Sequence, residues 1–120
     1  MNPTHTLKSL TVQVSNKLSP IISNSFLIDG NVITNKESFF KEFAEKLKFP
    51  EYFGGNWDGF YDCITDLSWI KEDDGYLIIY ENSFNFQSND SENWKTANSI
   101  LFEAVDYWKQ QNQPMIIMFL

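Results

Sequence analysis

The residues Tyr76-Leu77-Ile78-Ile79-Tyr80 form a continuous apolar run directly after Gly75. A short run without polar alternation is typical of a strand that is buried on both faces, as in a parallel sheet. This stretch therefore predicts the centre of an α/β domain, and the flanking segments should supply the helices and the remaining strands.

A helix is predicted upstream of this strand, over 35–48. Thr34 and Glu37 have the spacing of a capping box and precede phenylalanines at helical intervals. Pro50 disfavours helical backbone in the residue before it, so the helix should end there.

The remaining elements follow from shorter patterns. Asn56 suits the N-cap of a second, short helix over 57–67. Alternating or continuous apolar residues predict the other elements. These are strands over 10–14, 26–28 and 115–120, a helix from about Ser91, and an irregular connection over 82–90.

The order of elements is strand, two helices, strand, helix and strand, after an additional N-terminal strand. This order is typical of one α/β domain with a small parallel sheet and right-handed crossovers. The wholly apolar run 115–120 should be an inner or covered strand. Since we find no signal peptide and no 18-residue apolar stretch, we expect a cytoplasmic protein without a membrane partner.

The net charge of −7 lies in one segment of the chain. There are 16 acidic residues, nine lysines and no arginine, and residues 51–81 alone carry the whole net charge. Six aromatic residues crowd positions 49–61, at the start of this segment. An acidic, aromatic-rich segment on an otherwise neutral domain indicates recognition of a cationic partner by electrostatic steering.

The composition also excludes several kinds of site. A nucleic-acid or phosphate binder would need clustered cations, and arginine above all. Cys63 is the only cysteine and His5 the only histidine. This excludes an internal disulfide, a multi-cysteine zinc site and a Ser-His-Asp or Cys-His catalytic site, so we expect no metal and no cofactor.

The helix predicted over 57–67 has an apolar side and an acidic side. Asp58, Asp62 and Asp66 form a row opposite the apolar residues. Like charges four residues apart destabilise a helix by about 0.2–0.5 kcal/mol per pair. Gly59 costs about 1 kcal/mol relative to alanine, and its missing side chain would let a partner approach. The alternative interpretation of the acidic side is a solvated surface without a function. A helix face that carries residues unfavourable for helix stability favours a binding site instead.

Two further features of the segment are predicted to be structural. Cys63 adjoins Asp62 with no cation nearby, so a buried thiol is expected rather than a reactive one. The acidic run 72–74 should form a solvated turn before the central strand.

The stretch Pro50–Thr65, PEYFGGNWDGFYDCIT, resembles the barstar family of inhibitors of the ribonuclease barnase. The family pattern is a Pro-Glu-Tyr-aromatic-Gly loop and an Asn N-cap, followed by Asp, an aromatic residue, Asp and Cys along a short helix. The order of elements extends a weaker resemblance from about Ser25 to the C-terminus. This implies a barstar-like domain over 25–120 and an N-terminal extension over 1–24 that adds a strand and a loop.

The resemblance implies a three-stranded parallel sheet packed with helices, and an inhibitor rather than an enzyme. The short helix and the loop before it would plug the basic active site of a ribonuclease or nuclease toxin in a 1:1 complex, as an immunity protein does. Asp62 would occupy the site for substrate phosphate. The implied partner-binding residues are Tyr52, Asn56, Asp58, Gly59, Asp62, Thr65 and Asp66.

The chain departs from the family pattern at three positions. Tyr107 stands where the family has an additional contact acid, which Glu103 or Asp106 could replace only in a different register. Leu67 replaces a tryptophan, and Asp66 replaces a small residue and adds charge to the row. These changes bear on the identity of the target.

The same acidic and aromatic residues are also compatible with other classes of function. An acidic regulatory or interaction module could bind a basic protein that is not a nuclease. A metal-assisted hydrolase could use Asp58 and Asp62 as ligands, although a helix face lacks the concave pocket that catalysis needs. Nucleic-acid binding by the aromatic residues is disfavoured, because stacking platforms need a positive groove beside them.

Overall fold

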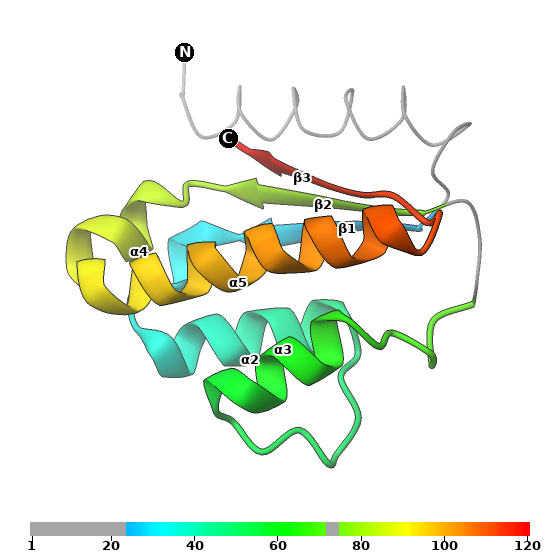
Figure 1. The fold of residues 1–120 in the computed structure, drawn as a ribbon. Coiled ribbons are helices and arrows are strands. Elements are labelled where there is room, and N and C mark those ends of the chain that lie inside the picture. The colour runs from blue at the N-terminus through cyan, green and yellow to red at the C-terminus, as the bar shows by residue number, and fades with distance from the viewer. Residues whose placement is uncertain (1–23, 72–74) are drawn as a thin grey trace.

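The computed structural model describes residues 24–71 and 75–120. The strands predicted over 26–28, at the central run and at the C-terminus are confirmed. They form one parallel sheet in the order β1-β2-β3 (Figure 1). The bounds are β1 Asn24–Asp29, β2 Tyr76–Glu81 and β3 Met115–Phe119. The strand predicted over 10–14 and the acidic turn over 72–74 lie outside the described residues.

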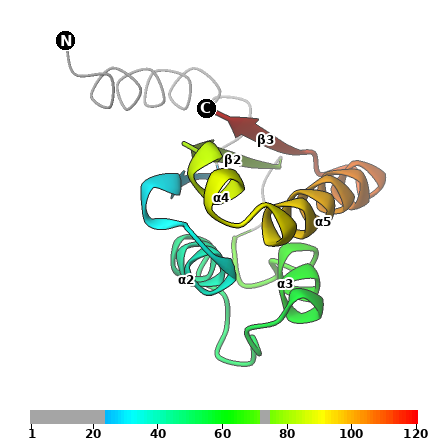
Figure 2. The same ribbon diagram turned by 90° about the vertical axis from the view of Figure 1, so that its left-hand side faces the viewer.

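The helices lie together on one side of the sheet (Figure 2). Strands that follow one another in sequence order through right-handed crossovers bring both connections to the same side. No helix of the described part of the chain is long and apolar enough to cross a membrane. The helical bounds are η1 Gly30–Val32 (a 3₁₀ turn), α2 Lys36–Lys46, α3 Trp57–Ile64, α4 Phe84–Asn89 and α5 Ser91–Gln110.

The central strand pairs in register with both neighbours. Tyr76 lies opposite Asn24 on β1 and Met115 on β3, and Tyr80 lies opposite Phe119. Every residue of β2 is buried, as its unbroken apolar run predicts.

The main core lies between the sheet and the helices. Phe39 and Phe43 of α2 pack against Phe60 of α3, with ring centroids 5.0 and 5.4 Å apart. Tyr80 of β2 lies 5.9 Å from the ring of Phe43. This aromatic cluster holds the apolar side of α3 inward, so the opposite side of the short helix faces solvent.

Helix α2 begins one residue later than its predicted capping box. Asn35 is the N-cap, and its Oδ1 accepts a hydrogen bond from the Ser38 N–H at 2.8 Å. Ser38 Oγ in turn accepts from the Asn35 N–H at 3.1 Å. The box of Thr34 and Glu37 is therefore wrong, because asparagine at the next position caps a helix at least as well as threonine.

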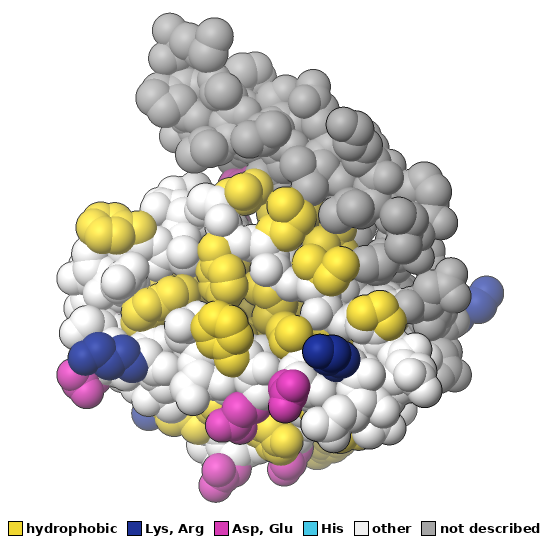
Figure 3. All heavy atoms as spheres, turned by 45° about the horizontal axis from the view of Figure 1, so that its top comes forward, with side chains coloured by type: hydrophobic (Ala, Val, Ile, Leu, Met, Phe, Trp, Pro, Cys, Tyr) yellow, Lys and Arg dark blue, Asp and Glu magenta, His cyan; other side chains and the backbone are white. Residues whose placement is uncertain are grey.

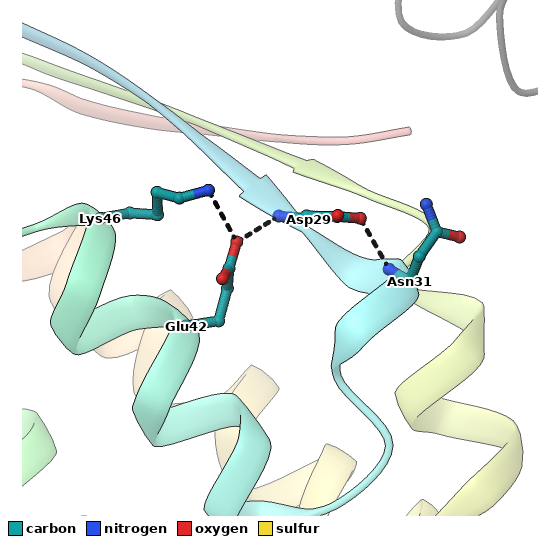
Figure 4. Close-up of polar contacts among 4 residues, drawn as sticks. All are labelled: Asp29, Asn31, Glu42 and Lys46. Carbon is teal, nitrogen blue, oxygen red and sulfur yellow. Dashed lines mark hydrogen bonds and ion pairs between the residues drawn. The ribbon is translucent and has the colours of Figure 1, made fainter.

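A buried carboxylate joins α2 to the end of β1. Glu42 Oε2 accepts hydrogen bonds from the Asp29 N–H at 2.8 Å and from Lys46 Nζ at 3.2 Å (Figure 4). Asp29 Oδ1 accepts from the Asn31 N–H at 3.0 Å and shapes the following 3₁₀ turn. These bonds provide the partners that a carboxylate with little solvent access requires.

The connection after β2 contains a helix that the sequence did not predict. Within 82–90, residues Phe84–Asn89 form α4, with Phe86 fully buried. Asn85 Nδ2 donates to the carbonyl oxygens of Gly30 at 2.9 Å and Ile33 at 3.2 Å. These tertiary contacts stabilise a turn of helix whose polar sequence shows no helical periodicity.

Among the described residues the C-terminal strand lies at an edge of the sheet, so it is not an inner strand there, and the predicted alternative of a covered strand stays a prediction. Within residues 24–71 and 75–120, β3 pairs with β2 alone, and Ile116 and Phe119 are 40% exposed. Hydrophobic side chains gather on the face drawn in Figure 3. On this side a groove of about 300 Å³ runs between α5 and β3, lined in part by Phe102 and Ile116.

Candidate functional site

The short helix α3 starts at the predicted cap. Asn56 Oδ1 accepts a hydrogen bond from the Gly59 N–H at 2.7 Å, which satisfies one of the unpaired donors of the first turn. Phe60 and Ile64 are fully buried on the sheet-facing side of α3. The cap and the two buried side chains together fix which side of the helix is presented to solvent.

The loop before α3 is held by phenylalanine packing. The Phe53 N–H donates to the Pro50 carbonyl oxygen at 3.0 Å, and the Phe53 ring lies 5.3 Å from Phe49 and 5.4 Å from Phe40. Tyr52, the residue before this anchor, projects into solvent with 64% of its surface exposed. A large aromatic side chain is thus presented to solvent by a well-packed loop.

Glycine at position 59 has a reason within the chain itself. A Cβ atom there would lie 3.1 Å from Asn56 Oδ1 and 3.3 Å from a ring carbon of Phe53. The missing side chain therefore lets the loop and the cap pack closely on α3. That the missing side chain of Gly59 also lets a partner approach α3 remains a prediction.

Helix α3 ends at Ile64, although the sequence predicted helix as far as Leu67. Thr65 is the C-cap, and both its N–H, at 3.1 Å, and its Oγ1, at 2.7 Å, donate to the Tyr61 carbonyl oxygen. Leu67 has φ of 52°, in the left-handed region, which ends the helical path. Asp66 therefore belongs to the turn after the helix.

The three aspartates of the row are all exposed. Asp58 lies in the first turn of α3, where the helix dipole favours an acid, and Asp62 lies in its second half. Asp66 is oriented by the loop, since its Oδ2 accepts a hydrogen bond from the Tyr52 hydroxyl at 3.1 Å. In the described part of the chain, no lysine forms an ion pair with any of the three.

The bond between Tyr52 and Asp66 is a feature that sequence reasoning missed. It joins the loop to the turn after α3 across 14 residues. Partial desolvation, together with the hydrogen bond to Asp66 and its charge, raises the pKa of Tyr52 above its ordinary value. The hydroxyl thus remains a donor at neutral pH. No local signal could have revealed the contact, because it depends on how loop and turn come together.

Cys63 is a buried thiol on the inner side of α3, as predicted. Burial raises its pKa, and the charges of Asp66 and Asp62 act in the same direction. A thiol that stays protonated is a poor nucleophile, which agrees with a structural role. Among residues 24–71 and 75–120, no group of three or more His, Cys, Asp or Glu side chains is placed to hold a metal ion.

Helix α5 lies beside α3. Trp108 Nε1 donates to the Ile64 carbonyl oxygen at 2.8 Å, which satisfies an acceptor at the end of α3. Tyr107 is partly buried, with its ring 5.2 Å from that of Trp108. Glu103 and Asp106 are both exposed on α5. No contact within the described residues distinguishes Glu103 from Asp106 as the candidate for the additional contact acid.

Together these features define a small α/β protein that presents an acidic helix and an aromatic loop to solvent. Residues 23–119 match the family described as Barstar (barnase inhibitor). Because this match covers most of the chain, the protein belongs to the barstar family.

One relative is similar over a shorter stretch. The chain is 39% identical over 44 residues to the protein named "Putative ribonuclease inhibitor YrdF" of Bacillus subtilis (strain 168). The aligned stretch covers 37% of this chain and 46% of the relative. The chain therefore matches less than half of the length of this relative.

Proposed function

We propose that this protein inhibits a bacterial ribonuclease by placing α3 and the loop before it in the basic active site of the enzyme. The observation that carries the proposal is the row of Asp58, Asp62 and Asp66, exposed together and without lysine partners in the described part of the chain. Membership of a family described as barnase inhibitors supports the same role.

The charges of the row suit the cationic groups that bind RNA phosphates in a ribonuclease. Carboxylates spaced one helical turn apart can accept charge-assisted hydrogen bonds from arginine and lysine side chains. Asp62, at the centre of the row, would take the place of a phosphate, and Asp58 and Asp66 would flank it. The protein would thus imitate the backbone of the substrate.

The uncharged site residues have supporting roles in this proposal. Tyr52 would add an exposed aromatic surface, and its bond to Asp66 would hold that carboxylate in position. Asn56 and Gly59 would shape the entry of α3. The Thr65 hydroxyl donates its hydrogen bond to the Tyr61 carbonyl oxygen, so towards the partner it would act as a hydrogen-bond acceptor.

The direct test is inhibition of RNA cleavage by a basic ribonuclease of the barnase type. With the enzyme held constant, increasing amounts of the protein should abolish cleavage at one equivalent, as expected for a tight 1:1 complex. The variant Asp58→Asn/Asp62→Asn keeps the size of both side chains and should inhibit much less. Full cleavage in the presence of excess wild-type protein would contradict the proposal.

A further inference from the structure

The topology leaves one face of the sheet without a helix among the described residues. Both helical connections pass over the same side (Figure 2). Since successive side chains of a strand point to opposite faces, alternate strand residues point to the other side. We call this other side the second face. Its apolar residues are Leu27 of β1, Leu77 and Ile79 of β2, and Ile116, Met118 and Leu120 in or next to β3. The strand register places Ser25, Asp29 and Glu81 on the same side.

The centre of the second face is apolar and closed to water. Leu77 and Ile79 of β2 are 0% and 1% exposed, whereas Leu27 of β1 and Ile116 of β3 are 41% and 40% exposed. Neighbours within a sheet flank a side chain but leave its outer end open. Burial that is complete at the middle strand and partial at both edges therefore indicates a cover along β2.

Glu81 gives a second indication of this cover. It follows Leu77 and Ile79 on the same side of β2 and is only 4% exposed. Its Oε1 has no hydrogen-bond partner among the described residues. Because an unpaired carboxylate oxygen is costly to remove from water, Glu81 favours a cover that carries cations or hydrogen-bond donors.

We propose that residues 1–23 of this chain cover the second face. This segment joins the sheet directly at Asn24, the first residue of β1. A strand of six residues is about 20 Å long, and 23 residues can follow it even as a helix, which would be about 35 Å long. Lys8 and Lys17 provide cations that suit Glu81. The apolar side chains of the segment are Leu7, Leu10, Val12, Val14, Leu18, Ile21 and Ile22.

Full-length variants with charge in the segment test the proposal. Leu10 and Val14 share one face of the segment whether its backbone is extended or helical. The variant Leu10→Asp/Val14→Asp should therefore displace the cover. The matched control is Thr11→Asp/Ser15→Asp, which adds the same charge at neighbouring polar positions.

The native methionines report on the two faces of β3. Met118 lies on the second face, and Met115 lies on the helix-facing side of the same strand and is buried in the main core. Oxidation by hydrogen peroxide, followed by tandem mass spectrometry, measures the two rates in one experiment. Relative to Met115, Met118 should oxidise on the order of tenfold faster in Leu10→Asp/Val14→Asp than in the wild type. The control should behave like the wild type.

Two results would overturn the proposal. One is a rate of Met118 oxidation that is the same in the wild type and in the Leu10→Asp/Val14→Asp variant. The other is protection of Met118 that disappears on dilution together with a dimer-to-monomer transition in sedimentation, which would assign the cover to a second copy. Near-UV circular dichroism checks folding. If the charged variant does not fold, Leu10→Ala/Val14→Ala allows the same comparison, and none of these measurements depends on the ribonuclease.

Discussion

Asp62 and Asp66 differ in what their carboxylates contact. Asp66 accepts the Tyr52 hydroxyl and is oriented by it. Asp62 has no hydrogen bond or ion pair to any residue in the described ranges, so its carboxylate can accept bonds from a partner on all sides. The central position and this unused capacity make Asp62 the residue on which binding should depend most.

The first prediction concerns Asp62→Ala. We expect this change to weaken the complex with the ribonuclease by about 2 kcal/mol or more, roughly 30-fold in Kd, because it would leave cations of the enzyme unpaired. Most of the loss should appear as faster dissociation. Surface plasmon resonance measures both rates.

Asp66→Ala is the matched comparison for Asp62→Ala. It should weaken the complex less, because one side of this carboxylate already contacts Tyr52. Both variants should keep the melting temperature of the wild type, since the two side chains are exposed. Equal affinity of wild type and Asp62→Ala would refute the role assigned to Asp62.

At the scale of elements, α5 offers two candidates for the additional contact acid. Val105 and Phe102 line the groove next to β3, whereas Trp108 bonds to the end of α3. Successive residues of a helix are 100° apart around its axis. On this basis Glu103 lies between the solvent-facing side of α5 and the side that carries Tyr107, opposite the side that lines the groove. Asp106 points straight outward. The helix geometry therefore favours Glu103 over Asp106.

The second prediction compares Glu103→Gln with Asp106→Asn. Each change removes one negative charge from α5, so their long-range effects on association should be similar. Glu103→Gln should weaken the complex about fivefold, the effect of losing one partly solvated ion pair, and Asp106→Asn should change the affinity little. Isothermal titration calorimetry measures the affinity of each variant for the ribonuclease. A larger loss of affinity for Asp106→Asn than for Glu103→Gln would assign the contact to Asp106 instead.

The boundaries of the helices could be predicted from local sequence patterns only in part. The cap at Asn56 and the inward side of α3 were predictable, because both depend on residues close in sequence. The early end of α3 was not predictable, because Leu67 adopts a left-handed conformation while its side chain is buried in the core. Helix α4 was missed for a similar reason, since contacts of Asn85 with residues more than 50 positions away stabilise it.

At the scale of the whole molecule, the distribution of charge should govern the rate of association. The acidic row and the loop beside it lie on the helical side of the molecule, away from the second face (Figure 1). The local potential is therefore negative where the proposed partner is positive, and encounters should be steered to the site.

The third prediction is that association slows as salt is added. Raising the ionic strength from roughly 0.01 M to 0.1 M shortens the Debye length from about 30 Å to about 10 Å. We expect the association rate constant for the ribonuclease to fall by on the order of tenfold, with a much smaller change in the dissociation rate. Stopped-flow tryptophan fluorescence measures both, and an association rate independent of salt would contradict electrostatic steering.

The sequence by itself predicted the three strands of the sheet, the helices α2, α3 and α5, and the side chains of the candidate site. The apolar run of β2, the cap at Asn56 and the spacing of the aspartates are local properties. The structure contains the strand and the capped helix that they predict, and the three aspartates are exposed, although Asp66 lies in the turn after the helix. Such features depend on side chains within a few residues of one another, so periodicity and capping chemistry suffice to predict them.

Only the tertiary structure decided how the elements are arranged. In the part of the chain that the structure describes, it placed β3 at an edge of the sheet, joined Tyr52 to Asp66, and put the helices on one side of the sheet. The physical reason is that strand order and crossover hand depend on contacts between residues far apart in sequence, on which local patterns carry no information. That arrangement leaves the second face without a helix among the described residues, and it also separates this face from the acidic row.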